Sequence, residues 1–239
     1  MPSEKRFIVS CSYEAKRQTH TGQETMLGRL LPTLEQAAGI RAIGLAPFHR
    51  NFPSFPARVI TTIDPSYRGA PIPMDVLQDR EDHRWFYLLA RDDDVCARLD
   101  EPPFFNGRPD DMYRVSDQGE AHNARLLLRD VLFFGVAVRE AVRLLVGDIP
   151  CTWLLHEWQG AACILGNSRN GRDPFYLLLR SSYDSKAVAS KLLLDFGIDP
   201  DACPGPGNCP TILERAMCLL PRAQAPERYD ETRHEQRGP

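Results

Sequence analysis

The chain has 239 residues, of which 43% are hydrophobic and 26% charged, and its formal net charge is −3. A chain of this length buries roughly 70% of the surface that its unfolded form exposes, so it does not require a disulfide scaffold. The near-neutral charge argues against a nucleic-acid-binding protein, which usually has a basic stripe or a high pI. No run approaches 18 apolar residues, and the N-terminus lacks the apolar core of a signal peptide, so we expect a cytoplasmic protein.

The first fifty residues predict a strand, a helix and a second strand. The apolar run at Phe7–Cys11 predicts a strand that is covered on both faces. Apolar residues at helical spacing over 26–38 predict a helix, which Gly39 ends. Residues 40–47 then predict the second strand.

The middle of the chain contains a proline-rich segment and a long helix. Residues 48–82 predict hairpins with one strand at 59–63, and residues 85–90 predict a buried strand. We expect a loop over 91–111. Apolar residues at 3-4 spacing then predict a helix over 121–146.

The last third continues the alternation of strands and helices. We expect a strand ending at His156, a helix over 157–165, a strand from Phe175 that includes Arg180, and a helix over 185–197. Thr211 and Glu214 form a T-x-x-E capping box that opens a final helix. Residues 1–221 are therefore one domain, and the charged tail at 222–239 should be disordered.

This alternation predicts an α/β fold, with a Rossmann-like, doubly wound and mostly parallel sheet. Five strands should lie in that sheet, namely residues 7–11, 40–46, 85–90, 151–155 and 175–180.

Seven cysteines are present without a C-x-x-C pair, so neither a zinc site nor a redox motif is indicated. Cys203 and Cys209 flank the CPGPGNC loop and could approach each other. In a reducing cytosol we expect free thiols instead.

Two polar segments follow predicted strands, where open parallel sheets bind ligands. In the segment 19–28, Gly22 allows the backbone to approach a ligand, and the following helix directs its positive end there. The segment matches neither G-x-G-x-x-G nor a P-loop, and a plain βα turn explains it equally well.

The second segment is LLHEWQGA. His156 at the tip of a strand, followed by Glu157 and Trp158, is well placed to hydrogen-bond a polyhydroxylated ligand and stack on it. From these residues alone, a slightly better explanation is that Trp158 packs into the core and His156 caps the next helix.

Taken together, these segments resemble glycogen and starch synthases. Four matches occur in order over residues 5–220. Thr21-Gly22 with Leu31-Pro32 is similar to the family signature K-T-G-G-L-x-D-V…L-P, and FFNGRPDDMY is similar to F-F-x-R…Y-G. The predicted helix with Phe133, Phe134 and Ala137 is similar to the helix before H-D-W, and His156-Glu157-Trp158-Gln159 is similar to H-D-W-Q.

The resemblance implies a GT-B glycosyltransferase, in which two Rossmann-like domains close over a cleft. It implies retaining transfer of glucose from ADP-glucose or UDP-glucose to an α-1,4-glucan, without a metal or cofactor. His156 would occupy the catalytic position beside the transferred sugar. The other substrate-binding positions that it implies are His20, Thr21, Gly22, Glu157, Trp158 and Tyr183, with Trp158 supporting the loop.

Several positions depart from the family pattern. His20 replaces the family lysine, Gln23 the second glycine and Met26 the aspartate, and Leu179 stands at the histidine of T-I-H-N. The sequence also ends where the second domain would begin. We therefore expect a truncated or split enzyme that needs a separate C-terminal GT-B domain.

Two other hypotheses remain. One is a non-catalytic module that binds glucan or nucleotide sugar. The other is a Rossmann-like interaction domain whose resemblance is only structural. Neither a nucleic acid nor a membrane is an expected partner.

Overall fold

The computed structural model describes eight stretches of the chain: residues 7–14, 29–36, 39–52, 54–108, 111–166, 173–179, 187–208 and 210–220. The predicted segment 19–28 with His20, Thr21 and Gly22 lies outside them. So do Tyr183, Cys209 and the predicted tail at 222–239.

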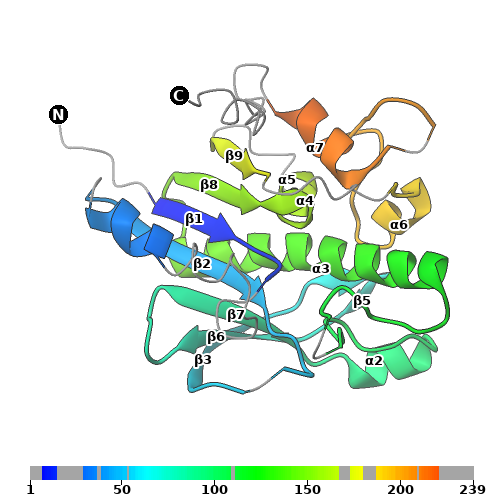
Figure 1. Cartoon of the computed structure of the whole chain (residues 1–239), viewed down its shortest axis with the longest axis horizontal. Coiled ribbons are helices and arrows are strands. Elements are labelled where there is room, and N and C mark those ends of the chain that lie inside the picture. The colour runs from blue at the N-terminus through cyan, green and yellow to red at the C-terminus, as the bar shows by residue number, and fades with distance from the viewer. Residues whose placement is uncertain are drawn as a thin grey trace, which may run out of the picture.

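A seven-stranded sheet forms the centre of the fold, in the order β3-β6-β7-β2-β1-β8-β9 (Figure 1). The five strands from β7 to β9 are parallel to one another, and β6 runs antiparallel to both of its neighbours, β7 and β3. The prediction of five strands in one mostly parallel sheet is confirmed. The strands are β1 (Phe7–Cys11), β2 (Arg41–Pro47), β3 (Ala57–Ile63), β6 (Met74–Asp79), β7 (Trp85–Ala90), β8 (Cys151–His156) and β9 (Phe175–Leu178).

Strand β1 lies in the interior of the sheet and is buried at all five residues. Val9 and Cys11 belong to the larger core, on the face that also packs against the long helix. Ile8 belongs to a smaller core on the opposite face, with Leu31 of the helical residues 29–36. Helices therefore cover both faces, which explains why β1 is apolar throughout.

Helix α3 (Glu120–Val146) covers the larger core with 27 residues, as predicted. It leads directly into the parallel strand β8, so it runs antiparallel to the strands, and its N-terminal end lies near their carboxyl ends (Figure 1). A Cβ atom at Gly135 would lie 2.6 Å from the carbonyl oxygen of Ala162. Glycine at this position therefore allows α3 to approach α5 (Ala162–Gly166) closely.

Some predicted elements differ from the structure. The predicted loop at 91–111 contains α2 (Asp93–Arg98), and the 48–82 segment contains the unpredicted strand β6. The hairpin of β4 (Ser66–Tyr67) and β5 (Ala70–Pro71) agrees with the hairpins predicted for that segment. The predicted helix at 157–165 is divided into α4 (Glu157–Gly160) and α5.

The last elements are shorter than predicted. Helix α6 is confined to Ser190–Leu194, because Ala187 bridges Thr211 and the Val188 N–H donates to the Pro210 carbonyl. Strand β9 ends at Leu178, ahead of the predicted Arg180. Helix α7 (Ile212–Leu219) has the predicted capping box between Thr211 and Glu214.

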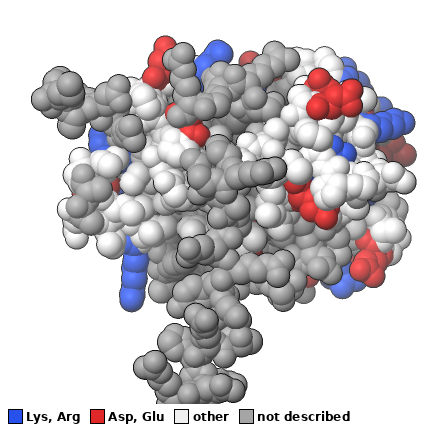
Figure 2. All heavy atoms as spheres, turned by 90° about the horizontal axis from the view of Figure 1, so that it is seen from above, with Lys and Arg blue, Asp and Glu red and all other residues white. Residues whose placement is uncertain are grey.

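Acidic and basic side chains of the described residues are interspersed on the face drawn in Figure 2. None of the described helices is long and apolar enough to cross a membrane. Each cysteine within the described stretches is a free thiol.

Candidate functional site

The carboxyl ends of the parallel strands form one edge of the sheet, here called the carboxyl edge, and both predicted segments follow strands that end there. Strands β1 and β8 are direct neighbours, with Cys11 opposite Leu155. The residues that follow β1 and the turn at 156–159 therefore leave the sheet side by side. The predicted segment 19–28 follows β1 in sequence but lies outside the described residues.

His156 is the last residue of β8, and its side chain is only 1% exposed. Its Nε2 atom lies 2.8 Å from the hydroxyl oxygen of the buried Ser10 on β1. His156 occupies the N-cap position of α4, but its side chain makes no capping hydrogen bond. The ring is thus held between two adjacent strands, and does not cap the helix that follows.

Glu157 has a backbone φ of 58°, in the left-handed region that favours glycine. For a residue with a Cβ atom this conformation costs about 1–2 kcal/mol. Such strain is often found at functional sites, where the surrounding structure imposes it. Glu157 is half-buried, so its side chain is more accessible to a ligand than the buried ring of His156.

Trp158 is 5% exposed and belongs to the larger core, as the core-packing explanation predicts. A side chain this deeply buried supports the turn and does not stack on a ligand. Gly160 ends α4, where a Cβ atom would lie 3.2 Å from the carbonyl carbon of Leu155 and 3.3 Å from the Cys11 carbonyl oxygen. Helix α4 therefore packs tightly across the ends of β1 and β8.

The structure adds a polar pair that the sequence analysis did not identify. The Tyr113 hydroxyl donates to Glu14 Oε1 at 2.6 Å, and both side chains are partly exposed. Tyr113 also stacks on Tyr13, with ring centroids 6.1 Å apart. Two features of the sequence could have indicated this pair. Glu14 lies three residues after a buried strand, and Tyr113 lies at the end of the FFNGRPDDMY segment.

His49 follows β2 at the same edge and is fully buried. Its Nε2 atom lies 2.9 Å from the Tyr13 carbonyl oxygen, which can only accept, so Nε2 carries the proton. Burial lowers the pKa of His49 to about 4, and the ring is therefore neutral at pH 7. Within the described stretches, no three His, Cys, Asp or Glu side chains are grouped so that they could hold a metal ion.

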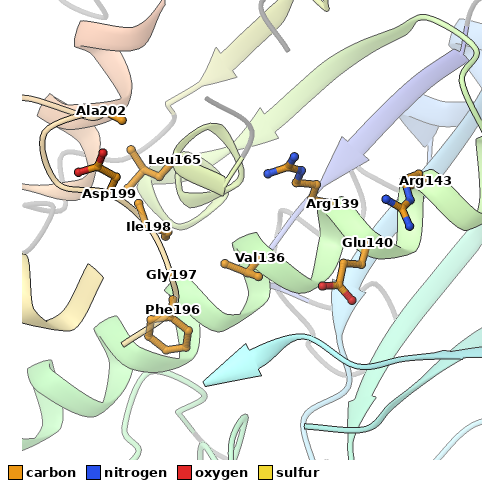
Figure 3. A pocket seen from close by; sticks show the side chains of 10 residues that line it. All are labelled: Val136, Arg139, Glu140, Arg143, Leu165, Phe196, Gly197, Ile198, Asp199 and Ala202. Atoms are coloured by element: carbon orange, nitrogen blue, oxygen red, sulfur yellow. The ribbon is translucent and has the colours of Figure 1, made fainter. Parts of the chain in front are cut away.

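A cavity of about 460 Å³ lies elsewhere, between α3, α5 and the turn after α6 (Figure 3). It is bordered by the C-terminal half of α3, which is remote from the carboxyl edge. Arg139 and Arg143 line it together with Glu140 and Asp199, so its lining has no preferred sign of charge. Burial raises the pKa of Glu140. None of the predicted site residues within the described stretches lines this cavity.

No family model and no curated protein sequence matches the chain. Among solved structures, it is similar to the catalytic domain of starch synthase IV from Arabidopsis thaliana bound to ADP and acarbose, with a TM-score of 0.63 and 13% sequence identity. The match covers 91% of this chain and 44% of that one, so this chain spans less than half of the starch synthase domain. The likeness shows the fold, a Rossmann-like α/β fold shared with a GT-B glycosyltransferase.

Proposed function

We propose that this chain is a glycosyltransferase domain of the glycogen and starch synthase kind, and that it binds ADP-glucose or UDP-glucose and an α-1,4-glucan at the carboxyl edge. The main support is that His156 lies at the tip of β8, directly beside the end of β1. The starch synthase with the same fold has ADP and acarbose bound. Ligands of open α/β sheets bind at this edge.

In the proposed reaction, the bond between the glucose C1 and the diphosphate oxygen breaks, and a bond from C1 to the acceptor O4 forms. The acceptor hydroxyl loses its proton, and ADP or UDP leaves. The developing charge on the diphosphate must be stabilised by positioned cationic or N–H groups in a site that excludes water. We propose that a second GT-B domain supplies much of this stabilisation, so this domain alone should bind ligands but transfer glucose poorly.

Within this proposal, the Ser10 hydroxyl holds the His156 ring in one orientation at the edge. Glu157 is the half-buried carboxylate next to it. The roles of His20, Thr21 and Gly22 at the nucleotide, and of Tyr183 at the substrate, remain part of the proposal.

Titration calorimetry with ADP-glucose, UDP-glucose and maltohexaose tests the binding. We expect one nucleotide sugar and the glucan to bind, and Ser10→Ala and Glu157→Gln to weaken that binding. Ser116→Ala is the control, since the Ser116 hydroxyl accepts a local N–H from Gln118 and the backbone bond to Asn123 does not depend on the side chain. If the wild type binds neither nucleotide sugar and no glucan, the proposal is wrong.

The alternative is a non-catalytic module that binds glucan or nucleotide sugar. It is favoured by the burial of His156, whose Nε2 atom is already bonded to Ser10. Incubation with ADP-[¹⁴C]glucose or UDP-[¹⁴C]glucose and glycogen, with and without an added C-terminal GT-B domain, separates the two functions. Incorporation that depends on the added domain supports the enzyme. Glycogen binding without incorporation in either case supports the module, and robust incorporation by the chain alone contradicts the need for a second domain.

A further inference from the structure

Two charged residues on α3 are fully buried, although α3 otherwise faces the apolar core. Arg129 and Asp130 both have side chains with 0% exposure, and Arg129 Nη2 donates to Asp130 Oδ1 at 2.8 Å. Apolar residues of similar size often stabilise a fold as well as a buried ion pair does. Core packing alone therefore does not account for this pair.

The pair holds four consecutive residues, 102–105, here called the 102–105 turn. Arg129 donates to the carbonyl oxygens of Pro102 at 2.8 Å and Pro103 at 3.2 Å, and its guanidinium lies 4.3 Å from the Phe104 ring centroid. Asp130 Oδ2 accepts the Phe105 N–H at 2.9 Å.

Phe105 itself has a φ of 55°, in the region that costs energy for a residue other than glycine. The backbone at this position must therefore be held by its surroundings. The hydrogen bond from its N–H to Asp130 is one such restraint.

Hydrogen bonds and ring contacts link the 102–105 turn to the residues just beyond β2 and β1. The Phe105 carbonyl accepts the backbone N–H of Arg50 at 3.2 Å, just beyond β2. The adjacent His49 donates from Nε2 to the Tyr13 carbonyl, just beyond β1. The Tyr13 ring meets the rings of His49 and Phe105 edge to face, with centroids 5.1 and 6.4 Å apart. Contacts thus run without interruption from α3 to the residues that precede Glu14.

We propose that Arg129 and Asp130 are positioning residues, which fix the 102–105 turn and, through it, Tyr13 and Glu14 at the carboxyl edge. The inference rests on the proposed function only for the identity of the ligand. A pair that merely stabilised the core would have no effect on the edge once that stability was restored by other means.

The double variant Arg129→Met/Asp130→Leu tests this, because apolar replacement can restore stability without restoring the bonds to the turn. The first readout is hydrogen exchange at the amides of Ser12 and Glu14, which donate to the Leu45 carbonyl and the Ser12 hydroxyl. The second is the affinity for ADP-glucose and UDP-glucose, and urea unfolding checks stability. Arg215→Met is the matched control, since Arg215 is also buried and bonded to a backbone carbonyl, but on α7.

We expect the double variant to unfold within the wild-type range, to exchange faster at Ser12, Glu14 and Phe105, and to bind nucleotide sugar roughly 2- to 30-fold more weakly, as substitutions acting through a packed network do. The control should leave the edge unchanged. If the folded double variant keeps wild-type exchange at Ser12 and Glu14, the positioning role is wrong.

If the double variant does not fold, Arg129→Lys replaces it. Lysine keeps the charge beside Asp130 but lacks the fork that reaches both proline carbonyls. It should loosen the same amides, and unchanged exchange there would overturn the inference. If the wild type binds neither nucleotide sugar, the proposed function fails, while the exchange experiment still decides the positioning role.

Discussion

Two buried groups beside the carboxyl edge should respond to pH in opposite directions. Burial lowers the pKa of His49 from 6.5 to about 4, so its contribution to stability is present above pH 6.5 and is lost as the pH falls towards 4. Burial raises the pKa of Asp130 from 3.8 to about 6, in spite of the attraction to Arg129. Its contribution is therefore present below pH 3.8 and is lost as the pH rises towards 6.

The two contributions are similar in size. Between the unfolded and folded states the pKa differs by about 2.5 for His49 and by about 2 for Asp130, which corresponds to roughly 3 kcal/mol per group. Over pH 4–6.5 they act in opposite directions, so in the wild type each partly offsets the pH dependence of the other.

Single substitutions should expose the two slopes. His49→Gln retains an N–H donor for the Tyr13 carbonyl and removes the histidine titration. Relative to wild type, its free energy of unfolding should rise as the pH falls from 6.5 to 4, whereas that of Asp130→Asn should fall. Urea unfolding followed by circular dichroism at half-unit pH steps measures both differences. The titration of the other carboxylates is common to wild type and variant, so it cancels when the two free energies of unfolding are subtracted. Slopes of the same sign, or slopes equal to the wild type, would refute the reasoning.

Three further predictions concern the local geometry. Glu157→Gly should be more stable than Glu157→Ala by about 0.5–1 kcal/mol in thermal unfolding, because glycine accepts a φ of 58° but loses more conformational entropy. Equal stability would show that Glu157 is not strained. Gly135→Ala should lower the free energy of unfolding by roughly 1–3 kcal/mol, because the new Cβ atom would clash with the Ala162 carbonyl. An unchanged urea midpoint would contradict that close contact. Tyr13→Phe should leave stability unchanged or raise it by up to about 1 kcal/mol, because the buried hydroxyl has no hydrogen-bond partner among the described residues. A loss of more than that amount would disprove the prediction.

The parallel strands could be predicted because their burial is visible in the sequence. Strand β1 is apolar at nearly every position, as a strand covered on both faces must be. Strand β6 was missed because its sequence, MDVLQD, is half polar. Its buried Asp75 pairs with Arg91, and Asp79 accepts the N–H of Glu81. Those partners lie outside the strand. The sequence of β6 alone therefore does not show that Asp75 and Asp79 can be buried.

The candidate site was predictable in part for a related reason. The position of His156 at a strand tip follows from the end of an apolar run. Its partner Ser10 is 146 residues away and depends on β1 and β8 being neighbours in the sheet. The pair of Glu14 and Tyr113 likewise joins residues 99 apart. The order of parallel strands decides such contacts, and one sequence does not specify that order.

A structural match at 13% sequence identity says more about the course of the backbone than about any reaction that the chain catalyses. Many apolar sequences satisfy the same burial pattern, so the likeness to a starch synthase domain supports the course of the strands and the position of the edge. Transfer chemistry depends on individual side chains, and His20 and Leu179 differ from the family pattern. A half-enzyme that transfers glucose slowly is therefore difficult to distinguish by activity from a binding module that does not transfer glucose. Affinity for each nucleotide sugar, measured with Ser10→Ala beside its control, tests the edge itself and depends on neither a second domain nor turnover.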